Sequence, residues 1–278
     1  MQKIIFINGR RVKADKKSIH RFSPGALRGK GVFETMRSYQ GKIFLLDKHL
    51  DRFLKGLKFL KIRSPYSRQK IKELISQALK VNKIKNARVR LMAQKQKKDL
   101  KIAVTCFKHD QKVLRKSQEG FKALRVRIGY ANLELPRMKS IDYRTYLLAY
   151  RQALKGGYDE AILIDKRSVT VEGSRTNIFC FKKGKLYTPH LRCGCLPGIT
   201  RAWVIQLTKK LGIVCRPKIV SKNDLLGSDE VFLTNAYLGI VPLVQLDHIH
   251  LGNGKPGRLT RQITRAYHKS VKHFVALQ

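Results

Sequence analysis

The feature that most constrains the fold is an irregular mixture of strand patterns and helical patterns along a chain of 278 residues. Two early stretches, 3–13 and 31–46, each contain a residue pair that favours a β-hairpin turn, Asn8-Gly9 and Gln40-Gly41. Because strands and helices follow one another without a regular βαβ rhythm, the sequence predicts an α+β fold rather than a doubly wound sheet.

The remaining elements are assigned from hydrophobic periodicity and turn residues. In chain order we expect helices over about 50–60 and 67–81, strands 88–93, 101–107 and 121–128, helix 143–155, strand 161–165, a hairpin of 177–181 and 185–187 turned at Lys183-Gly184, helix 199–211, strands 231–234 and 240–246, and helix 259–272. The polar stretch 108–120 has little periodicity and is interpreted as a linker. It divides a small domain, 1–118, from a larger one, 119–278.

Composition narrows the class of protein. Apolar residues make up 43% of the chain, enough for a real core, and no apolar run is long enough to span a bilayer. The N-terminus reads as a strand rather than a signal peptide, so we expect a cytoplasmic protein. The five cysteines are an odd number without metal-ligand spacing, so we expect reduced thiols and no metal site.

The net charge of +42 is extreme. A basic chain attracts nucleic acid by releasing counterions, yet the sequence has no zinc finger, RNP signature or basic zipper. Much of the lysine falls on ordinary helix surfaces, so a general compositional bias or steering of anionic ligands explains the charge better than specific nucleic-acid binding.

Three segments carry residues that suit one kind of chemistry. Lys139 lies in Met138-Lys-Ser-Ile-Asp-Tyr143, just before an expected helix. Glu172 lies in Val171-Glu-Gly-Ser-Arg-Thr-Asn-Ile-Phe179, and Leu196-Pro-Gly-Ile-Thr-Arg201 starts a later helix. A lysine can hold an aldehyde and move protons, a buried carboxylate can keep a pyridine nitrogen protonated, and a helix N-terminus can bind phosphate.

In this order and spacing the segments resemble the fold-type IV family of pyridoxal-phosphate (PLP) enzymes. The family includes branched-chain aminotransferases, D-amino-acid aminotransferases and aminodeoxychorismate lyases, and the resemblance covers nearly the whole chain. It implies a two-domain D-amino-acid-aminotransferase-like fold, with a small N-terminal α/β domain, a larger C-terminal pseudo-barrel domain, PLP at their interface, and a homodimer.

The resemblance also implies roles for individual residues. Lys139 is the catalytic lysine that holds the cofactor, and Glu172 faces the pyridine nitrogen. The other expected cofactor-binding residues are Arg52, Tyr143, Leu196, Gly198, Ile199, Thr200, Asn235 and Ala236. The expected residues of the substrate pocket are Arg28, Phe33, Arg88 and Arg90; the two arginines of 88–90 share one face of an expected strand and suit substrate carboxylates. Plain surface arginines, a core Phe33 and a helix-surface ion pair of Arg52 are the alternatives.

The branch of the family is read from Asn235-Ala-Tyr-Leu-Gly-Ile-Val-Pro242. Family aminotransferases tend to carry a Thr and a Glu-Ile here, whereas this stretch is similar to aminodeoxychorismate lyases. Arg28-Gly-Lys-Gly31 departs from the aromatic residue and Asp usual before Gly-Val-Phe-Glu-Thr, and the connection 94–99 is short for the family. We therefore expect a lyase that forms 4-aminobenzoate and pyruvate from an anionic amino substrate. A branched-chain or D-amino-acid aminotransferase is the alternative, and a basic nucleic-acid-binding protein on a retired enzyme scaffold is a remote one.

Overall fold

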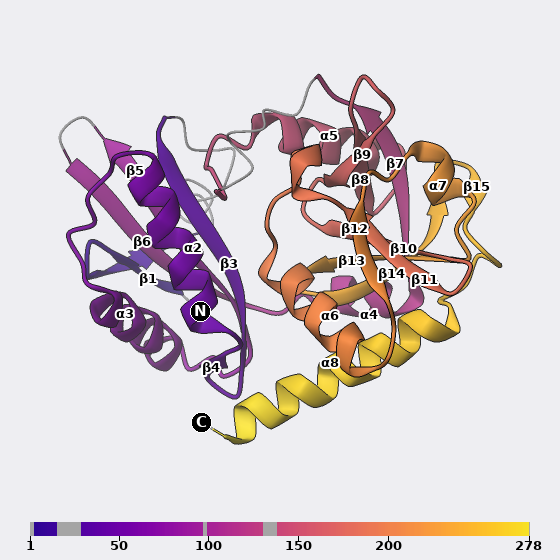
Figure 1. The fold of residues 1–278 in the computed structure, drawn as a ribbon. Coiled ribbons are helices and arrows are strands. Elements are labelled where there is room, and N and C mark those ends of the chain that lie inside the picture. Colours follow the sequence, from indigo (N-terminus) through magenta and orange to yellow (C-terminus); the bar gives the residue numbers. More distant parts are fainter. Residues whose placement is uncertain (1–2, 16–28, 97–98, 130–137, 278) are drawn as a thin grey trace. The chain divides into compact units, whose positions relative to one another are not determined.

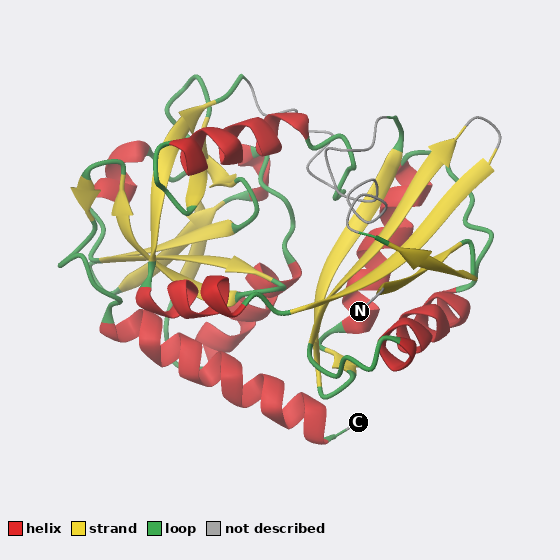
Figure 2. Ribbon diagram, turned by 180° about the vertical axis from the view of Figure 1, so that it is seen from behind, coloured by secondary structure: helices red, strands yellow, loops and turns green. Residues whose placement is uncertain are grey.

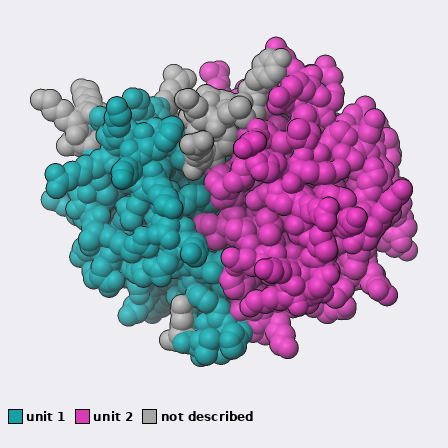
Figure 3. All heavy atoms as spheres, in the orientation of Figure 1, with its two compact units in different colours: residues 1–109, 138–143, 273–278 teal, residues 110–137, 144–272 magenta. Residues whose placement is uncertain are grey.

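The structure is a computed structural model that describes residues 3–15, 29–96, 99–129 and 138–277. The described chain forms two compact units, which Figure 3 colours separately. Unit 1 consists of 1–109, 138–143 and 273–278, and unit 2 consists of 110–137 and 144–272. The division into folding domains 1–118 and 119–278 stays a prediction.

Unit 1 contains a six-stranded sheet in the order β2-β1-β6-β5-β3-β4. Its elements are β1 (Lys3–Ile7), β2 (Arg10–Ala14), β3 (Gly31–Tyr39), β4 (Lys42–Ile43), α2 (Leu46–Phe59), α3 (Arg68–Val81), β5 (Ala87–Gln96) and β6 (Asp99–Lys108). Both expected hairpin turns are present, and the turn pairs Asn8-Gly9 and Gln40-Gly41 all have positive φ, as a type I′ turn requires. The pairing of β5 with β6 extends to Gln96 and Asp99.

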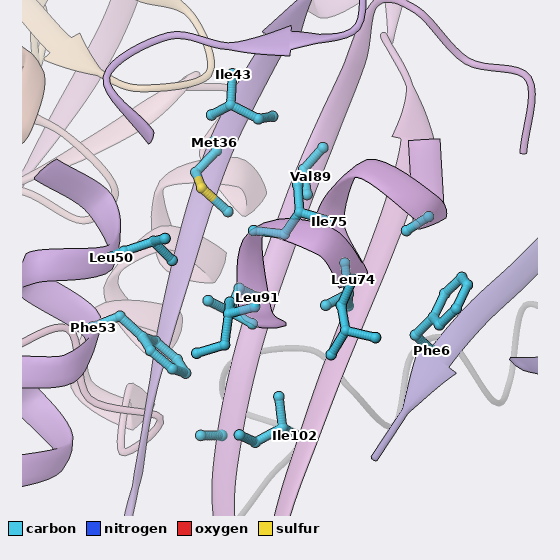
Figure 4. Packing of buried hydrophobic residues seen from close by; sticks show 14 of the residues in the cluster. Phe6, Met36, Ile43, Leu50, Phe53, Leu74, Ile75, Val89, Leu91 and Ile102 are labelled. Atoms are coloured by element: carbon cyan, nitrogen blue, oxygen red, sulfur yellow. The ribbon is translucent and has the colours of Figure 1, made fainter. Parts of the chain in front are cut away.

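Helices α2 and α3 cover one face of this sheet, and Figure 2 shows the strands from the opposite side (Figures 1 and 2). The covered face supplies alternate strand residues such as Met36, Val89 and Leu91, each at 0% exposure. Leu50 and Phe53 of α2 meet them at helical spacing, as Figure 4 shows. This packing fixes β3 and β5, so that their other residues, among them the buried Phe33 and Met92, lie on the face opposite α2 and α3.

Unit 2 is built on a curled sheet in the order β12-β11-β10-β13-β14-β7-β8-β9, with β15 beside β14. Its strands are β7 (Phe121–Arg127), β8 (Glu160–Ile164), β9 (Thr170–Gly173), β10 (Asn177–Lys182), β11 (Lys185–Pro189), β12 (Cys215–Lys218), β13 (Glu230–Asn235), β14 (Gly239–Leu246) and β15 (Ile249–His250). Strand β9, at one end of the order, also lies near β10 and β11, so the sheet bends into a half-barrel. The expected α+β fold with a pseudo-barrel is confirmed.

The helices of unit 2 are α4 (Gln111–Glu119), α5 (Arg144–Lys155), η2 (Leu191–Cys193), α6 (Ile199–Lys210), α7 (Lys222–Leu226) and α8 (Arg258–Ala276, of which residues up to 272 belong here). Helix α5 packs on β8 and β7, and α6 packs on β13. In the adjoining part of the sheet, the rings of Phe179 and Phe232 stack with centroids 4.9 Å apart. The inner side of the half-barrel is filled by aliphatic residues of β7, β8, β10, β13 and β14.

The stretch 108–120, expected to be a linker with little periodicity, is mostly the helix α4, and the division between the two units falls near its start, between His109 and Asp110. Asp110 caps this helix, its side chain accepting hydrogen bonds from the backbone N–H groups of Lys112 and Val113. Leu114 packs against the core of the half-barrel. The packing of Leu114 and the Asp110 N-cap stabilise this short helix, and hydrophobic periodicity does not predict it because most of its residues are polar.

Candidate active site

Lys139 is held in unit 1 by backbone pairing with the start of β3. The Phe33 N–H donates to the Lys139 carbonyl oxygen at 2.9 Å, and the Ile141 N–H donates to the Gly31 carbonyl oxygen at 3.1 Å. Glycine at position 31 allows this approach, since a Cβ there would lie 2.8 Å from Cδ1 of Ile141, and it would also lie 2.2 Å from the Ala93 carbonyl oxygen of the neighbouring strand β5. The segment 138–143 thus lies along the sheet at a fixed register.

The Lys139 ammonium group lies beside two aromatic rings. Its Nζ lies 4.7 Å from the ring centroid of Phe33 and 5.9 Å from that of Tyr143. The two rings meet edge to face, with centroids 5.6 Å apart. Two predicted site residues therefore flank the predicted catalytic lysine and restrict where its amine can reach.

Near this lysine, the predicted site residue Arg52 forms a buried cluster with two side chains that the sequence analysis did not identify, Glu34 and His49. Glu34 has 0% exposure, and Arg52 binds it with both Nε and an Nη nitrogen at 2.7 Å. The Nδ1 atom of His49 lies 2.7 Å from the second Glu34 oxygen. This bidentate pair fixes the orientation of the Arg52 guanidinium group.

The charge states of this cluster follow from its burial. Burial raises the pKa of Glu34, but Arg52 and His49 outweigh it and lower the pKa to about 2. Burial lowers the pKa of His49 and outweighs the opposing hydrogen bond with Glu34. Glu34 is therefore an ionised acceptor, and a neutral His49 donates to it from Nδ1–H.

Arg88 and Arg90 share the sheet face that α2 and α3 leave uncovered, as strand alternation predicts. In the β3–β5 ladder Arg88 lies opposite Arg37, Arg90 opposite Thr35, and Phe33 opposite Met92. Burial and the neighbouring Arg88 lower the pKa of Arg90 to about 10, although Tyr143 opposes this shift. Arg90 and Arg88 thus lie along the same ladder as the aromatic residues around Lys139.

In unit 2, Glu172 is buried at 4% exposure and held by three donors. The Tyr146 hydroxyl donates to Oε1, and the Asn177 amide and the Leu196 backbone N–H donate to Oε2, each at 3.1 Å. Asn177 also donates to the Leu196 carbonyl oxygen at 2.9 Å. These contacts tie the acid on β9 to the segment that leads into α6.

Helix α6 begins immediately after that segment. Gly198 is the N-cap residue of this helix, and Ile199 and Thr200 are the first two helical positions. Because glycine has no side chain, no side-chain hydrogen bond caps the first N–H groups of the helix. A Cβ at Gly198 would lie 1.9 Å from Oδ1 of Asn177. The glycine allows the helix N-terminus, with its unsatisfied N–H groups, to approach Asn177 and Glu172.

Replacing Gly198 by alanine is therefore expected to cost about 1–3 kcal/mol in the free energy of unfolding, because the new methyl group forces Asn177 or the start of α6 to move. Urea denaturation measures this loss. The matched control is Gly129→Ala, where a Cβ would meet no atom within 4 Å. Equal stability of the two variants would refute the close approach.

Asn235 and Ala236 lie at the end of β13, in a turn shaped by the asparagine. Oδ1 of Asn235 accepts hydrogen bonds from the backbone N–H groups of Tyr237 at 3.0 Å and Leu238 at 2.7 Å. The preceding Thr234 lies directly opposite Asn177 in the β10–β13 ladder, so the two side chains share a face. Oγ1 of Thr234 is buried and has no hydrogen-bond partner among the described residues.

The structure sorts the predicted site residues into two groups. Unit 1 contains Phe33, Arg52, Arg88, Arg90, Lys139 and Tyr143, and unit 2 contains Glu172, Leu196, Gly198, Ile199, Thr200, Asn235 and Ala236. Arg28 lies outside the described residues.

The sequence reading missed several side chains that complete these groups. They are Glu34, His49, Tyr146, Asn177 and Thr234. Signals were available: Asn177 lies within the Glu172 segment, and Tyr146 follows Tyr143 by three residues, close to one helical turn. Glu34 likewise lies within the segment Gly31-Val-Phe-Glu-Thr35, and His49 precedes the predicted Arg52 by three residues.

Comparison with known proteins decides the family. The family profile described as amino-transferase class IV matches residues 31–246. The chain belongs to this family. Class IV relatives include an aminodeoxychorismate lyase of Bacillus subtilis, 32% identical over 98% of this chain and 96% of its own. A branched-chain-amino-acid aminotransferase of Pseudomonas aeruginosa is 28% identical over 95% and 91%.

Solved class IV structures share the fold. A branched-chain amino acid aminotransferase from T.th., solved in complex with N-(5'-phosphopyridoxyl)-L-glutamate, superposes with a TM-score of 0.86 at 25% identity and covers 98% of this chain and 94% of its own. Within the described ranges of this class IV chain, no helix is both long and apolar enough to cross a membrane.

Proposed function

We propose that the chain is a pyridoxal-phosphate-dependent lyase that converts 4-amino-4-deoxychorismate into 4-aminobenzoate and pyruvate. The observation that carries the cofactor assignment is the buried Glu172 carboxylate, held by three donors beside the N-terminus of α6. A fixed anion of this kind favours a protonated pyridine nitrogen. The similar aminotransferase structure that was solved with a phosphopyridoxyl compound supports the same cofactor.

The residues present suit this cofactor in two further respects. The N-terminus of α6 has no side-chain cap, and Gly198 keeps its N–H groups accessible for a phosphate. The buried hydroxyl of Thr234, which has no partner among the described residues, lies on the Asn177 side of the sheet and can supply a hydrogen bond to a bound polar group. Lys139 would hold the cofactor aldehyde, and Arg52, fixed by Glu34, would bind its phosphate.

When bound, the cofactor supplies an aldehyde that takes up the substrate amine and a ring that accepts electrons from the adjacent carbon. Lys139 Nζ then removes the proton from the amine-bearing carbon, and Tyr143 and Phe33 orient this amine. The ether bond that joins the enolpyruvyl group to the substrate ring breaks, and the substrate ring becomes aromatic. The departing group takes up a proton to give pyruvate. Arg90 and Arg88 would hold the substrate carboxylates.

The lyase branch is favoured by the turn after β13. Asn235 uses its Oδ1 to shape this turn, and Ala236 brings no hydroxyl, in contrast to the Thr that family aminotransferases tend to carry there. The Bacillus subtilis lyase, which matches nearly the whole chain, supports this branch. The second candidate is an aminotransferase for branched-chain or D-amino acids, which the Pseudomonas aeruginosa relative and the similar aminotransferase structure favour. A homodimer and a cytoplasmic location stay predictions.

The deciding assay supplies PLP and 4-amino-4-deoxychorismate without any 2-oxo acid and follows 4-aminobenzoate. We expect product from the wild-type protein without a second substrate, because a lyase returns its cofactor to the starting form in each turnover. An aminotransferase would instead require a 2-oxo acid for repeated turnover. Protein that binds PLP, forms no 4-aminobenzoate and transfers amino groups to 2-oxoglutarate would refute the lyase assignment.

A further inference from the structure

The outer face of α8 carries a continuous row of basic side chains that the proposed chemistry does not use. α8 is the long yellow helix of Figure 1, and its residues 258–272 belong to unit 2. The helix contains no aspartate or glutamate. Its exposed cations recur every three or four residues, at Arg258, Arg261, Arg265, Lys269 and Lys272. At this spacing the five side chains share one face of the helix, and we call them the α8 basic stripe.

The opposite face of α8 anchors the helix in unit 2. Buried residues recur along this face at four-residue spacing, namely Ile263, Tyr267 and Val271. A Cβ at Gly239 would lie 2.8 Å from Cε1 of Tyr267, so this ring packs closely on β14. The Trp203 Nε1–H donates to Oγ of Ser270 at 3.0 Å and ties α8 to α6. Because the buried face is fixed in this way, the α8 basic stripe is held toward solvent.

No acidic side chain among the described residues forms an ion pair with the α8 basic stripe. The acid beside the start of the helix, Glu230, instead accepts hydrogen bonds from the backbone N–H groups of Leu259 at 3.0 Å and Thr260 at 2.7 Å. Arg261 donates from Nη1 to the carbonyl oxygen of Pro256, which is a neutral group. The five positive charges are therefore not compensated by the fold.

A general excess of basic residues does not by itself produce such a stripe. On α2 and α3, acids stand among the cations and pair with them. Asp47 lies 2.7 Å from Lys72 and 3.3 Å from Arg68, and Asp51 also pairs with Arg68. The α8 basic stripe thus differs from these helix surfaces by the absence of interspersed acids and not only by its number of cations.

The arrangement is also unfavourable for the helix itself. Arg265 follows Arg261 by four residues, and Lys269 follows Arg265 by four, and like charges at this spacing destabilise a helix. Arg258 and Arg261 lie in the first turn, where the helix dipole disfavours cations. A polyanion bound along the stripe would relieve both effects.

The shape and chemistry of the stripe favour a nucleic-acid backbone over a lipid surface. From Arg258 to Lys272 the stripe extends about 21 Å, at 1.5 Å per residue. A flexible single strand can follow such a row, and basic surfaces bind its phosphates by releasing counterions. Membrane-surface helices insert an apolar face, whereas the apolar face of α8 is buried in unit 2.

We propose that the α8 basic stripe binds the sugar–phosphate backbone of single-stranded nucleic acid without preference for sequence. The guanidinium and ammonium groups contact phosphates, and the five side chains include no aromatic ring on which a base could stack. The proposal is independent of the proposed enzyme function, because none of the five residues belongs to the candidate active site.

Fluorescence anisotropy with a labelled oligothymidylate of about 20 nucleotides tests the proposal. The stripe variant combines four substitutions: Arg261→Gln, Arg265→Gln, Lys269→Gln and Lys272→Gln. We expect it to bind at least about tenfold more weakly than wild type at about 100 mM salt. The slope of log K against log salt concentration should decrease in magnitude by about 3, since each lost phosphate contact removes about 0.7. Its melting temperature should not fall, because the substitutions remove like-charge pairs from an exposed face.

The matched control removes two arginines and two lysines from exposed positions of unit 2 outside α8, by Arg151→Gln, Lys155→Gln, Lys185→Gln and Arg192→Gln. It should bind the oligothymidylate within about threefold of wild type, and so should the charge-conserving Arg261→Lys/Arg265→Lys protein. The proposal is overturned if wild type does not bind, or if the control weakens binding as much as the stripe variant, since the total charge would then be responsible. A stripe variant that loses binding to phosphatidylserine vesicles but keeps the oligothymidylate would also overturn it and assign the stripe to a lipid surface.

Discussion

Lys139→Ala is expected to reduce turnover by about 10²–10⁴-fold through loss of proton transfer alone, and to abolish covalent attachment of the cofactor. The physical reason is that the Lys139 amine lies beside the Phe33 and Tyr143 rings, and the backbone at Lys139 and Ile141 is hydrogen-bonded to β3. Mass spectrometry after borohydride reduction measures attachment, and steady-state product formation measures turnover.

Lys80→Ala is the matched control, because Lys80 is an exposed lysine at the end of α3 in the same unit. It should retain both the adduct and the activity. A Lys139→Ala protein that still carries the reduced cofactor on another lysine would refute the assignment. Because the chain is rich in lysine, this control is needed to exclude adventitious modification of an exposed amine.

The parts of the fold that the sequence predicts are those encoded by neighbouring residues. Asn8-Gly9, Gln40-Gly41 and Lys183-Gly184 all adopt positive φ at both positions, and each closes a hairpin as expected. The apolar spacing of α2 likewise corresponds to the residues it buries. Local backbone preferences and one-face burial act within a few residues, so a single sequence reveals them.

The missed elements depend on distant partners. The short strand β9 pairs with β8, and the capped helix α7 has only five residues, so neither has enough periodicity to be recognised.

The candidate site also depends on residues that are distant in the sequence. Glu172 was singled out from its segment, but its donor Tyr146 lies 26 residues away on α5, and their contact exists only once β9 and α5 have packed in unit 2.

The sequence leaves the role of Arg52 open, whereas the structure shows what orients its guanidinium group. The resemblance implied a contact with the cofactor, and the alternative was an ion pair on the helix surface. The ion pair exists, yet its acid, Glu34, is fully buried on β3 rather than on the helix surface. A buried pair that uses two nitrogens of the guanidinium group orients the remaining one, so the ion pair is compatible with the proposed phosphate contact.

Glu34→Gln is expected to lower the free energy of unfolding by about 3 kcal/mol or more near neutral pH. The variant keeps the shape of the side chain but removes the charge that compensates the half-buried Arg52, and breaking one partner of a buried ion pair is strongly destabilising. His49 would lose its acceptor as well. Urea denaturation measures the loss, and the exposed Glu73→Gln, which removes only a surface pair with Lys70, should change stability by less than about 0.5 kcal/mol.

The pH dependence provides a second, independent test of the same cluster. The pKa of Glu34 is lowered from 4.5 to about 2 in the folded state, so its ionised form stabilises the protein above pH 4.5, and this contribution is lost as the pH falls toward 2. The stability difference between wild type and Glu34→Gln should therefore be constant above pH 5 and shrink below 4.5. A difference that does not change between pH 5 and 2.5, or an unfolding free energy no lower than that of Glu73→Gln, would contradict a buried ionised Glu34 and with it the fixed orientation of Arg52.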